Sequence, residues 1–425
     1  MSVDLTGLDY LPLPVPKHDQ VFHPLKICIA SPDFVGPVKN GGVGTAFTAL
    51  GEALASFGHR VTLLFLGGDF CENLTMDHWI AYYAKQNIRF VPLPSNRLIS
   101  ADVSFPMRNS YEAYQWLRNQ HFDIIHFSEW RGPGYYSLLA KKQGLAFEKT
   151  ILAVQTHGPS FWHTLSNGEY ITQAEQLEIN FMEQESVRLA DVVISPSRYL
   201  LEWMKSAKWQ LPPVCYVQQY VMPRNVRRMQ RIDRENIQPI KEIVFFGRLE
   251  ERKGIVLFCD ALDRITSKGV DPFDVTFLGK KATIRGQNCE EYLMKRAAKW
   301  GLNWKIISDK DQNGAIEYLC QPNRLAVTPS LADNLPNTVL ECLGAGIPFL
   351  ASNAGGIPEM IYPEDVERVC FPLRPAALAD KLIEALNDGV KPARLAHNVE
   401  ENEQAWIGWH NGLPDVLPRG LKKVE

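Results

Sequence analysis

The chain has 425 residues, of which 45% are hydrophobic and 22% are charged, and its formal net charge is −3. This composition is ordinary for a globular protein with a core. At roughly 100–200 residues per domain, the length predicts two domains and at most three. The small net charge gives no reason to expect a protein that binds nucleic acid or an anionic membrane through its overall charge.

The eight cysteines are dispersed along the chain, and no two of them form a C-x-x-C pair. Several lie within apolar runs, as reduced core cysteines do, so we expect a reducing compartment and no metal site. The first residues do not have the pattern of a signal peptide, and no apolar run reaches the roughly 18 residues of a membrane-spanning helix. The predicted location is therefore the cytoplasm.

Strand-like and helix-like segments alternate along the first half of the chain. Residues 25–31, LKICIAS, form a continuous apolar run, as a buried parallel strand does. Residues 42–59 carry apolar residues at helical spacing. Further strand-like runs follow at residues 60–66, 88–93, 123–128, 150–157 and 191–197. This alternation predicts an α/β fold with a doubly wound parallel sheet.

The composition changes after Val221, where residues 222–242 are polar and charged and are expected to form a linker. Alternation then restarts, with strand-like runs at residues 243–249, 274–279, 304–308, 324–330 and 348–352, and helices expected from about Lys253, near 290–300, from about Pro336 and at 376–388. We therefore predict a Rossmann-like domain over residues 1–222, a second one over 223–395, and a helix or tail over 396–425 that returns to the first domain.

Two such domains facing each other would leave a cleft, and open α/β sheets bind ligands at the carboxyl ends of their strands. Three residues of the first domain, Glu129, Arg131 and His157, lie at such strand ends. Gly41 and Gly42 open a helix, where glycines let the backbone approach an anion, although a plain turn explains them as well. Their spacing does not fit the G-x-G-x-x-G pattern of a nicotinamide dinucleotide site.

Two cations follow the first strand of the second half. Arg248 ends that strand, and Lys253 lies five residues further on, next to Gly254 and an apolar helix. A guanidinium and an ammonium at a strand end suit a diphosphate. On spacing alone, a solvated charged loop is the simpler explanation.

The segment SLADNLPNTVLECLGAGIPFLASNAGGIPEM places one carboxylate on each side of a helix start, at Asp333 and Glu341. The amino terminus of that helix offers backbone N–H groups to an anion, and Glu341 lies about one turn inside it. Asp333 can instead be a simple helix N-cap.

Together these residues resemble the retaining glycosyltransferases of family 4, which have the GT-B fold of two Rossmann-like domains with a cleft between them. Glycogen and starch synthases are similar in layout. The resemblance covers residues 25–387, most of the chain, and rests on four motifs in order. They are the Lys39-Asn40-Gly41-Gly42 loop, His157 after a strand, the R-x-x-x-x-K-G run of Arg248, Lys253 and Gly254, and an acid pair at E-x7-E spacing.

For the second domain, the resemblance implies a nucleotide diphosphate sugar. Arg248 and Lys253 would hold the diphosphate and stabilise the charge that builds up as the sugar leaves, without a metal or another cofactor. Asp333 would contact the sugar and Glu341 the ribose. The segment between them would contact sugar and phosphate through backbone N–H groups; its residues are Asn334, Leu335, Pro336, Asn337 and Thr338.

For the first domain, the resemblance implies that His157 lies beside the reacting centre and that Gly41 and Gly42 close over the phosphates. Glu129 would face the acceptor or the sugar. The reaction in this family retains the anomeric configuration. The sequence departs from the family in having Asp333 where the first acid is a glutamate, and Val43 where a leucine is usual after the two glycines.

Several alternatives stay open. A sugar-nucleotide epimerase has the same fold, and a nucleotide-sugar-binding protein without turnover would also carry a donor site. The acceptor is unassigned among saccharides, sugar phosphates and lipid-linked saccharides, with Arg108 and Arg131 as candidate partners for an acidic group. UDP and a hexose such as glucose are the most common donor parts and are expected on that ground. The basic run 224–231 could contact a membrane surface, although a solvated linker is the simpler explanation.

Overall fold

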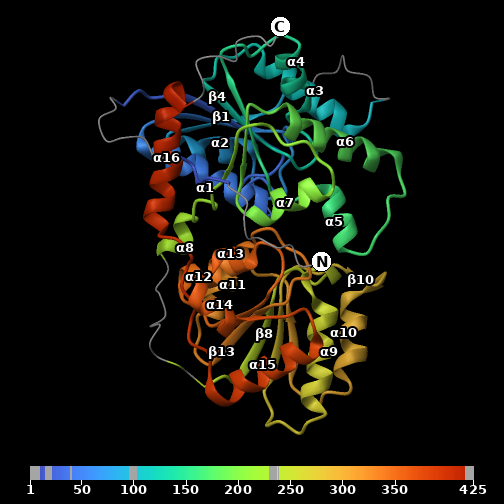
Figure 1. Ribbon diagram of the computed structural model, residues 1–425. Coiled ribbons are helices and arrows are strands. Elements are labelled where there is room, and N and C mark those ends of the chain that lie inside the picture. Colours follow the sequence, from blue (N-terminus) through green and yellow to red (C-terminus); the bar gives the residue numbers. More distant parts are fainter. Residues whose placement is uncertain are drawn as a thin grey trace. The chain divides into compact units, whose positions relative to one another are not determined.

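The computed structural model describes residues 10–14, 22–38, 41–94, 103–228, 237 and 239–416, and Figure 1 shows its elements. The chain divides into two compact units. Unit 1 comprises Met1–Thr164, Tyr170–Pro223 and Asn398–Glu425, and unit 2 comprises Leu165–Glu169 and Arg224–His397. Each unit is built on its own parallel sheet, so each is described by itself below.

Unit 1 contains a seven-stranded sheet in the order β3-β2-β1-β4-β5-β6-β7, and all its pairings are parallel. Its strands are β1 (Lys26–Ser31), β2 (Arg60–Phe65), β3 (Ile88–Pro92), β4 (Ile124–Ser128), β5 (Ile151–Gln155), β6 (Val192–Ser195) and β7 (Cys215–Val217). The first six correspond to the six predicted runs. The three-residue edge strand β7 was not predicted, because its half-buried residues show no apolar run.

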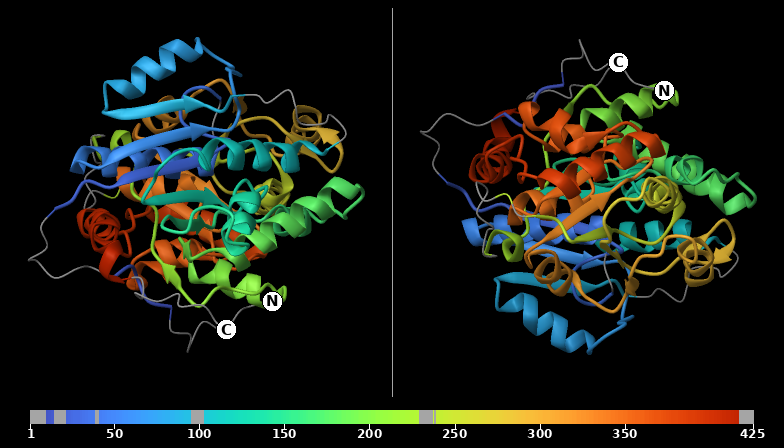
Figure 2. Two further views of the ribbon diagram at one scale, coloured as in Figure 1. Left: turned by 90° about the horizontal axis from the view of Figure 1, so that it is seen from above. Right: turned by 90° about the horizontal axis from the view of Figure 1, so that it is seen from below.

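Both faces of this sheet are buried, which explains why its strands read as continuous apolar runs. Successive residues of a strand point to opposite faces, so Ile27 and Ile29 enter one core cluster while Cys28 and Ala30 enter the other. The helices are α1 (Gly42–Phe57), α2 (Met76–Ala84), α3 (Phe105–Leu117), α4 (Tyr135–Lys142), α5 (Ser160–Ser166, which begins in this unit), α6 (Ala174–Leu189), α7 (Arg198–Ser206) and α16 (Val399–Val416). Figure 2 shows α2 lying along β3 at one edge of the sheet.

The C-terminal helix α16 contributes to the core of unit 1 and packs against α1. Trp406 and Trp409 are buried in the core cluster that also contains Ile27. The indole Nε1–H of Trp406 donates to the carbonyl oxygen of Gln219 at 2.8 Å. His410 reaches across to β4, where its Nε2 lies 2.9 Å from Nε2 of His126.

The His126–His410 pair is neutral in the folded protein. Nδ1 of His410 lies 2.7 Å from the carbonyl oxygen of Trp406, so this nitrogen carries the proton and donates it. Nε2 of His410 is then an acceptor, and Nε2–H of His126 donates to it. Burial lowers the pKa of His126 to about 3, and it lowers the pKa of His410 well below its usual value.

This pair makes the folded protein sensitive to acid. In the unfolded chain His126 takes up a proton near pH 6.5, whereas in the folded protein it stays neutral. Between pH 7 and 5.5 the native protein should therefore lose about 1 kcal/mol more unfolding free energy than a His126→Asn variant, which has no such group. Urea denaturation at the two pH values measures the difference. A His78→Asn variant, which loses an exposed histidine, is the control and should respond as the native protein does. An equal loss in the His126→Asn variant would contradict the argument.

Unit 2 contains a six-stranded parallel sheet in the order β12-β9-β8-β13-β14-β15 and a separate antiparallel pair, β10-β11. Its strands are β8 (Glu242–Phe246), β9 (Asp274–Leu278), β10 (Thr283–Ile284), β11 (Gln287–Asn288), β12 (Trp304–Ile307), β13 (Arg324–Thr328), β14 (Phe349–Ser352) and β15 (Cys370–Phe371). Its helices are α8 (Arg224–Arg228), the 3-10 turn η1 (Glu251–Lys253), α9 (Ile255–Thr266), α10 (Cys289–Ala297), α11 (Gln312–Leu319), α12 (Asn337–Ala345), α13 (Ile357–Met360), α14 (Pro363–Val369) and α15 (Pro375–Asp388).

Two local predictions for unit 2 are corrected. The predicted linker begins with helix α8, which packs against α12 and buries Val226. One apolar residue in five gives no helical periodicity, so the pattern could not predict this helix. Residues 229–231, the rest of the basic run 224–231, lie outside the described residues. The helix expected from Lys253 begins instead at Ile255, because Gly254 adopts a left-handed conformation between it and η1.

The predicted doubly wound parallel sheets are confirmed in both halves of the chain. In the part of the chain that the structure describes, no helix is long and apolar enough to cross a membrane. All eight cysteines are free thiols.

Candidate functional site

Each sheet reverses its strand order once, and the reversals mark where ligand-binding loops are expected. The reversal lies between β1 and β4 in unit 1 and between β8 and β13 in unit 2. Loops that leave the carboxyl ends of the strands at such a point bind ligands in open α/β sheets. In unit 2 these loops carry Arg248, Lys253 and Asp333, and in unit 1 Glu129 follows β4 and His157 follows β5.

A buried ion pair joins the loops after β8 and β13. Lys253 Nζ donates to Oδ2 of Asp333, and the two side chains are only 17% and 11% exposed. Ser330 Oγ donates to the same carboxylate oxygen at 3.0 Å, and Nη1 of Arg252 lies 3.6 Å from the other one. The sequence motifs predicted Lys253 and Asp333 as separate site residues. The structure shows that they form an ion pair, and that Arg252 and Ser330, which no motif predicted, lie beside it.

The cluster keeps its charges. Burial alone would raise the pKa of Asp333, but Lys253 and Arg252 outweigh this effect and hold it below its usual range. Burial lowers the pKa of Lys253, and the Asp333 carboxylate opposes that shift. Asp333 is not the N-cap of α12, because that position is Pro336, so this alternative is wrong.

Two glycines allow these loops to approach so closely. Gly254 has φ +78°, and a Cβ there would lie 1.8 Å from the carbonyl oxygen of Pro329. Gly355 has φ +62°, and a Cβ there would lie 1.8 Å from the carbonyl oxygen of Asp333, which also accepts the N–H of Gly356 at 3.0 Å. Neither position could hold a larger residue without moving the Asp333 loop or its neighbour.

The nine-residue helix α12 begins at Asn337 and has no side-chain cap. Within the predicted donor segment, Asn334, Leu335 and Pro336 are buried, whereas Asn337 and Thr338 are half-buried. A helix amino terminus without a side-chain cap can direct backbone N–H groups toward an anion. Arg248, in the loop after β8, offers a more accessible charge: its side chain is 54% exposed, and its Nη1 lies 3.8 Å from Oε2 of Glu250.

Glu341 lies within α12 and is buried. Its Oε1 accepts a hydrogen bond from Gln312 Nε2 at 2.6 Å, and burial raises the pKa of the carboxyl group to about 7. Gln312 Oε1 in turn accepts from Asn225 of α8 at 3.3 Å. Helix α8, which was not predicted, therefore helps to position the Glu341 carboxylate through Gln312.

In unit 1, Glu129 holds the loop that carries His157. The carboxylate is fully buried and accepts the backbone N–H of His157 at 2.7 and 2.8 Å and that of Gly158 at 2.5 Å. Burial raises the pKa of Glu129 to about 7, although these backbone donors oppose the shift. Both oxygens are engaged by the protein's own backbone, which favours a positioning role over the predicted contact with acceptor or sugar.

Glu183 on α6 continues this network and was not predicted. It is fully buried and accepts Ser160 Oγ at 2.6 Å and the backbone N–H of Arg131 at 2.8 Å. Burial raises its pKa to about 8. Its place beside Met182 and Val187 on the apolar face of the helix is the signal that could have found it, because a carboxylate on such a face needs buried donors.

The ring of His157 is held between two aromatic side chains. Tyr220 stacks on it at 5.3 Å between centroids and places its hydroxyl 2.9 Å from Nδ1, and Phe47 of α1 contacts it edge-on at 5.0 Å. Burial lowers the pKa of His157 to about 3, so the imidazole is neutral at physiological pH. Tyr220 had no sequence signal, since it lies in a stretch without periodicity.

The predicted glycine loop lies at the start of α1. Gly41 is the N-cap and Gly42 the first helical residue. Oδ2 of Asp33 accepts the N–H of Gly41 at 2.8 Å and that of Gly44 at 3.3 Å, so a carboxylate already lies at this helix terminus. Lys39 and Asn40, the rest of the motif, lie outside the described residues.

The two arginines proposed for an acidic acceptor group lie on different elements. Arg108 is on α3, where its guanidinium carbon lies 5.8 Å from the centroid of the Phe105 ring. Arg131 follows β4 with φ +63°, is exposed, and lies over the ring of Trp130 at 4.8 Å. Among the described residues, no group of three or more His, Cys, Asp or Glu side chains could hold a metal ion.

Comparison with known proteins identifies the two halves of the chain. Residues 40–217 match the model of Glycosyltransferase Family 4, and residues 229–406 match that of Glycosyl transferases group 1. An uncharacterized glycosyltransferase from Methanocaldococcus jannaschii is 25% identical over 173 residues, which is 40% of this chain and 42% of that protein. The aligned part thus spans less than half the length of that relative.

Two solved structures resemble this chain over most of its length. Sucrose-phosphate synthase from Thermosynechococcus elongatus has a TM-score of 0.62 at 17% identity and covers 92% of this chain and 97% of its own. The Anabaena protein HepE, solved in complex with UDP and glucose, has a TM-score of 0.59 at 16% identity and covers 92% and 98%. Similarity at this level of identity concerns the fold, and it agrees with the predicted pair of Rossmann-like domains.

Proposed function

Because this chain belongs to the glycosyltransferases of group 1 and family 4, we propose that it moves a hexose from a UDP-linked donor to an acceptor hydroxyl, with retention of configuration and without a metal. The acceptor class is a saccharide, a sugar phosphate or a lipid-linked saccharide. The free thiols suit a cytoplasmic enzyme.

One observation carries the proposal: the loop after β8 carries Arg248 and Lys253, the loop after the adjacent strand β13 leads into helix α12, and the Lys253–Asp333 pair joins the two loops. Arg248 is exposed and Lys253 is held by Asp333, while α12 begins without a side-chain cap. Guanidinium, ammonium and backbone N–H groups are the donors that bind a diphosphate. HepE, which shares the fold, was solved with UDP and glucose, and this supports a uridine donor here.

In the proposed reaction, the bond between the anomeric carbon and the diphosphate oxygen breaks. The acceptor oxygen forms the new bond on the same face, and its proton passes to the departing diphosphate. Arg248 and Lys253 stabilise the charge that develops on the diphosphate. We assign Asp333 the role of positioning Lys253, in addition to the sugar contact that the family resemblance implies, and we assign Glu341 to the ribose.

The unit 1 residues are proposed to act on the sugar and the acceptor. His157 is the candidate for contact with the transferred sugar, and its ring is already oriented by Tyr220 and Phe47. Gly41 and Gly42 stay candidates for closing over the phosphates. Arg108 and Arg131 stay candidates for an acidic group on the acceptor, and Glu129 acts through the His157 loop.

Replacing Arg248 with alanine should weaken UDP binding at least about tenfold, because one charge-assisted contact to a phosphate is worth about 1.5–3 kcal/mol and every 1.4 kcal/mol is a factor of ten. The measurement is the UDP concentration that gives half of the maximal rise in melting temperature. An Arg264→Ala variant removes an exposed arginine of α9 and should bind UDP as the native protein does. ADP, GDP and NAD are tested in the same melting-temperature titration. A shift with NAD alone, or with none of the nucleotides, would overturn the donor-site assignment.

Turnover separates an enzyme from a binding protein. UDP-glucose should be consumed in the presence of a suitable acceptor, and His157→Ala should remove that turnover while leaving the UDP-induced melting shift in place. Anomeric proton couplings of the product report retention or inversion. UDP binding without turnover on any acceptor of the three classes would support the binding protein, and conversion of the donor sugar itself would support the epimerase.

A further inference from the structure

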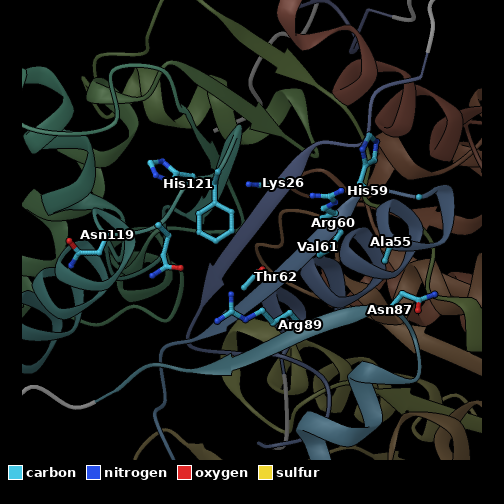
Figure 3. A pocket seen from close by; sticks show the side chains of 13 residues that line it. Lys26, Ala55, His59, Arg60, Val61, Thr62, Asn87, Arg89, Asn119 and His121 are labelled. Atoms are coloured by element: carbon cyan, nitrogen blue, oxygen red, sulfur yellow. The ribbon is translucent and has the colours of Figure 1, made fainter.

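A cationic pocket lies at the amino-terminal edge of the unit 1 sheet, opposite to the edge at which Glu129 and His157 follow their strands. It has a volume of about 720 Å³, and Figure 3 shows its side chains. Its lining is drawn from the end of α1, from the starts of β1, β2 and β3, and from the turn after α3. It includes the cationic side chains of Lys26, Arg60 and Arg89 and the buried ring of His59. No motif of the sequence marked this place.

The strand register brings three cations onto one face of the sheet. Lys26 pairs with Arg60 across β1 and β2, and Thr62 pairs with Arg89 across β2 and β3. Residues paired in a parallel sheet point to the same face, and residues two apart in one strand do so as well. Lys26, Arg60 and Arg89 therefore project together beside the turn that follows α3, as Figure 3 shows.

These cations lack counter-charges within the described part of the chain. Lys26, Arg60 and Arg89 are exposed, and none forms an ion pair with another described residue. One carboxylate, Asp123, lies nearby, but its Oδ2 accepts the backbone N–H of Lys26 at 2.7 Å. Like charges held side by side repel one another, and an anion bound between them relieves that repulsion.

We propose that this pocket binds a phosphate monoester, with its phosphate on Arg60, Arg89 and Lys26. Two guanidinium groups and an ammonium match a phosphate dianion. The amides of Asn87, Asn119 and Gln120 and the hydroxyl of Thr62 can hydrogen-bond to a polar organic part, and Phe122 offers it an apolar surface. The volume lies within the range of small-molecule sites, so there is room for a sugar or a nucleoside beyond the phosphate.

The pocket is separate from Glu129 and His157, the strand-end residues of unit 1. The strands of unit 1 are parallel, so their amino ends lie at the edge of the sheet opposite to their carboxyl ends, after which Glu129 and His157 follow. A strand of six residues such as β1 spans about 20 Å. A ligand here would not compete with the sugar at His157, which makes this an effector site or a storage site rather than part of the reaction centre.

The test is calorimetric titration of the full chain with three probes: glucose 6-phosphate, AMP and inorganic phosphate. Native protein should bind an ester saturably, and an Arg60→Gln/Arg89→Gln variant should bind it at least tenfold more weakly. The matched control, Lys85→Gln/Lys149→Gln, loses two exposed charges of unit 1 elsewhere and should match the native affinity within twofold. The ester that binds more tightly identifies the organic part as a sugar or a nucleoside.

Three outcomes would overturn the proposal. Unchanged affinity in the Arg60→Gln/Arg89→Gln variant would place the anion elsewhere, including on Arg248 and Lys253. If inorganic phosphate binds as tightly as both esters, the pocket recognises the phosphate alone and not an organic part. No binding of any probe, together with arginine-dependent sedimentation on vesicles of anionic lipid, would make the patch a membrane contact. If the double variant fails to fold, the single Arg89→Gln variant applies the same criteria.

Discussion

A Lys253→Ala variant should lose about 3–5 kcal/mol of unfolding free energy and at least about a hundredfold in turnover. Removing the ammonium leaves the Asp333 carboxylate, whose side chain is 11% exposed, without its closest counter-charge, and breaking one side of a buried ion pair costs about this much. It also removes a proposed donor to the departing diphosphate. Urea denaturation measures the first effect and initial rates with UDP-glucose the second.

The double variant Lys253→Ala/Asp333→Ala separates the two roles of Lys253. Without the carboxylate no uncompensated charge remains, so its stability should exceed that of Lys253→Ala. Its turnover should stay low, because the ammonium is still absent. Turnover that recovers with stability would mean that Lys253 does no more than hold Asp333. Native stability in Lys253→Ala would show that the pair is not buried as described.

The second large effect is expected at Glu129. A Glu129→Ala variant should lose about 2–5 kcal/mol of unfolding free energy, because the N–H groups of His157 and Gly158 are left buried without an acceptor. Turnover should fall about ten- to a hundredfold, since the loop that carries His157 is no longer fixed. Removing an exposed carboxylate of the same unit, in a Glu148→Ala variant, should change neither quantity.

Glu129 also makes a pH prediction whose sign is opposite to that of the histidine pair. Its pKa is raised to about 7 in the folded protein, against about 4.3 in an unfolded chain, so the folded state holds the extra proton between these values. That contribution is complete below about pH 4 and is lost as the pH rises through 7. Between pH 6 and 8 the native protein should therefore lose about 1 kcal/mol more than a Glu129→Gln variant. Equal losses would show that Glu129 is ionised throughout.

Most of the sheet architecture could be predicted from local patterns, because a strand buried on both faces reads as an apolar run whatever surrounds it. The exceptions are short or polar elements. The edge strand β7 has three half-buried residues, and α8 has one apolar anchor, Val226, whose partner is the distant helix α12. Neither element carries a period that a pattern could detect.

The candidate site shows the same division between local and distant information. Arg248, Lys253, Asp333 and Glu341 could be singled out because strand ends and helix starts are local features. That Lys253 pairs with Asp333, 80 residues away, follows only from the arrangement of β8 beside β13. Glu129 shows the same limit: its place after β4 suggested a ligand contact, whereas the loop after the neighbouring strand β5 supplies its backbone donors.

The docking of α16 also has a consequence for the order in which the protein is made. Unit 1 takes Met1–Thr164 and Tyr170–Pro223 from one end of the chain and Asn398–Glu425, with helix α16, from the other. All of unit 2 except Leu165–Glu169 lies between these two parts. During synthesis, unit 2 leaves the ribosome before Trp406 and Trp409, which fill the core of unit 1, have been added to the chain. Domains generally fold as their residues emerge. Unit 2 can thus reach its native state before unit 1 is complete. Until α16 is made, unit 1 exposes an apolar surface that chaperones would recognise.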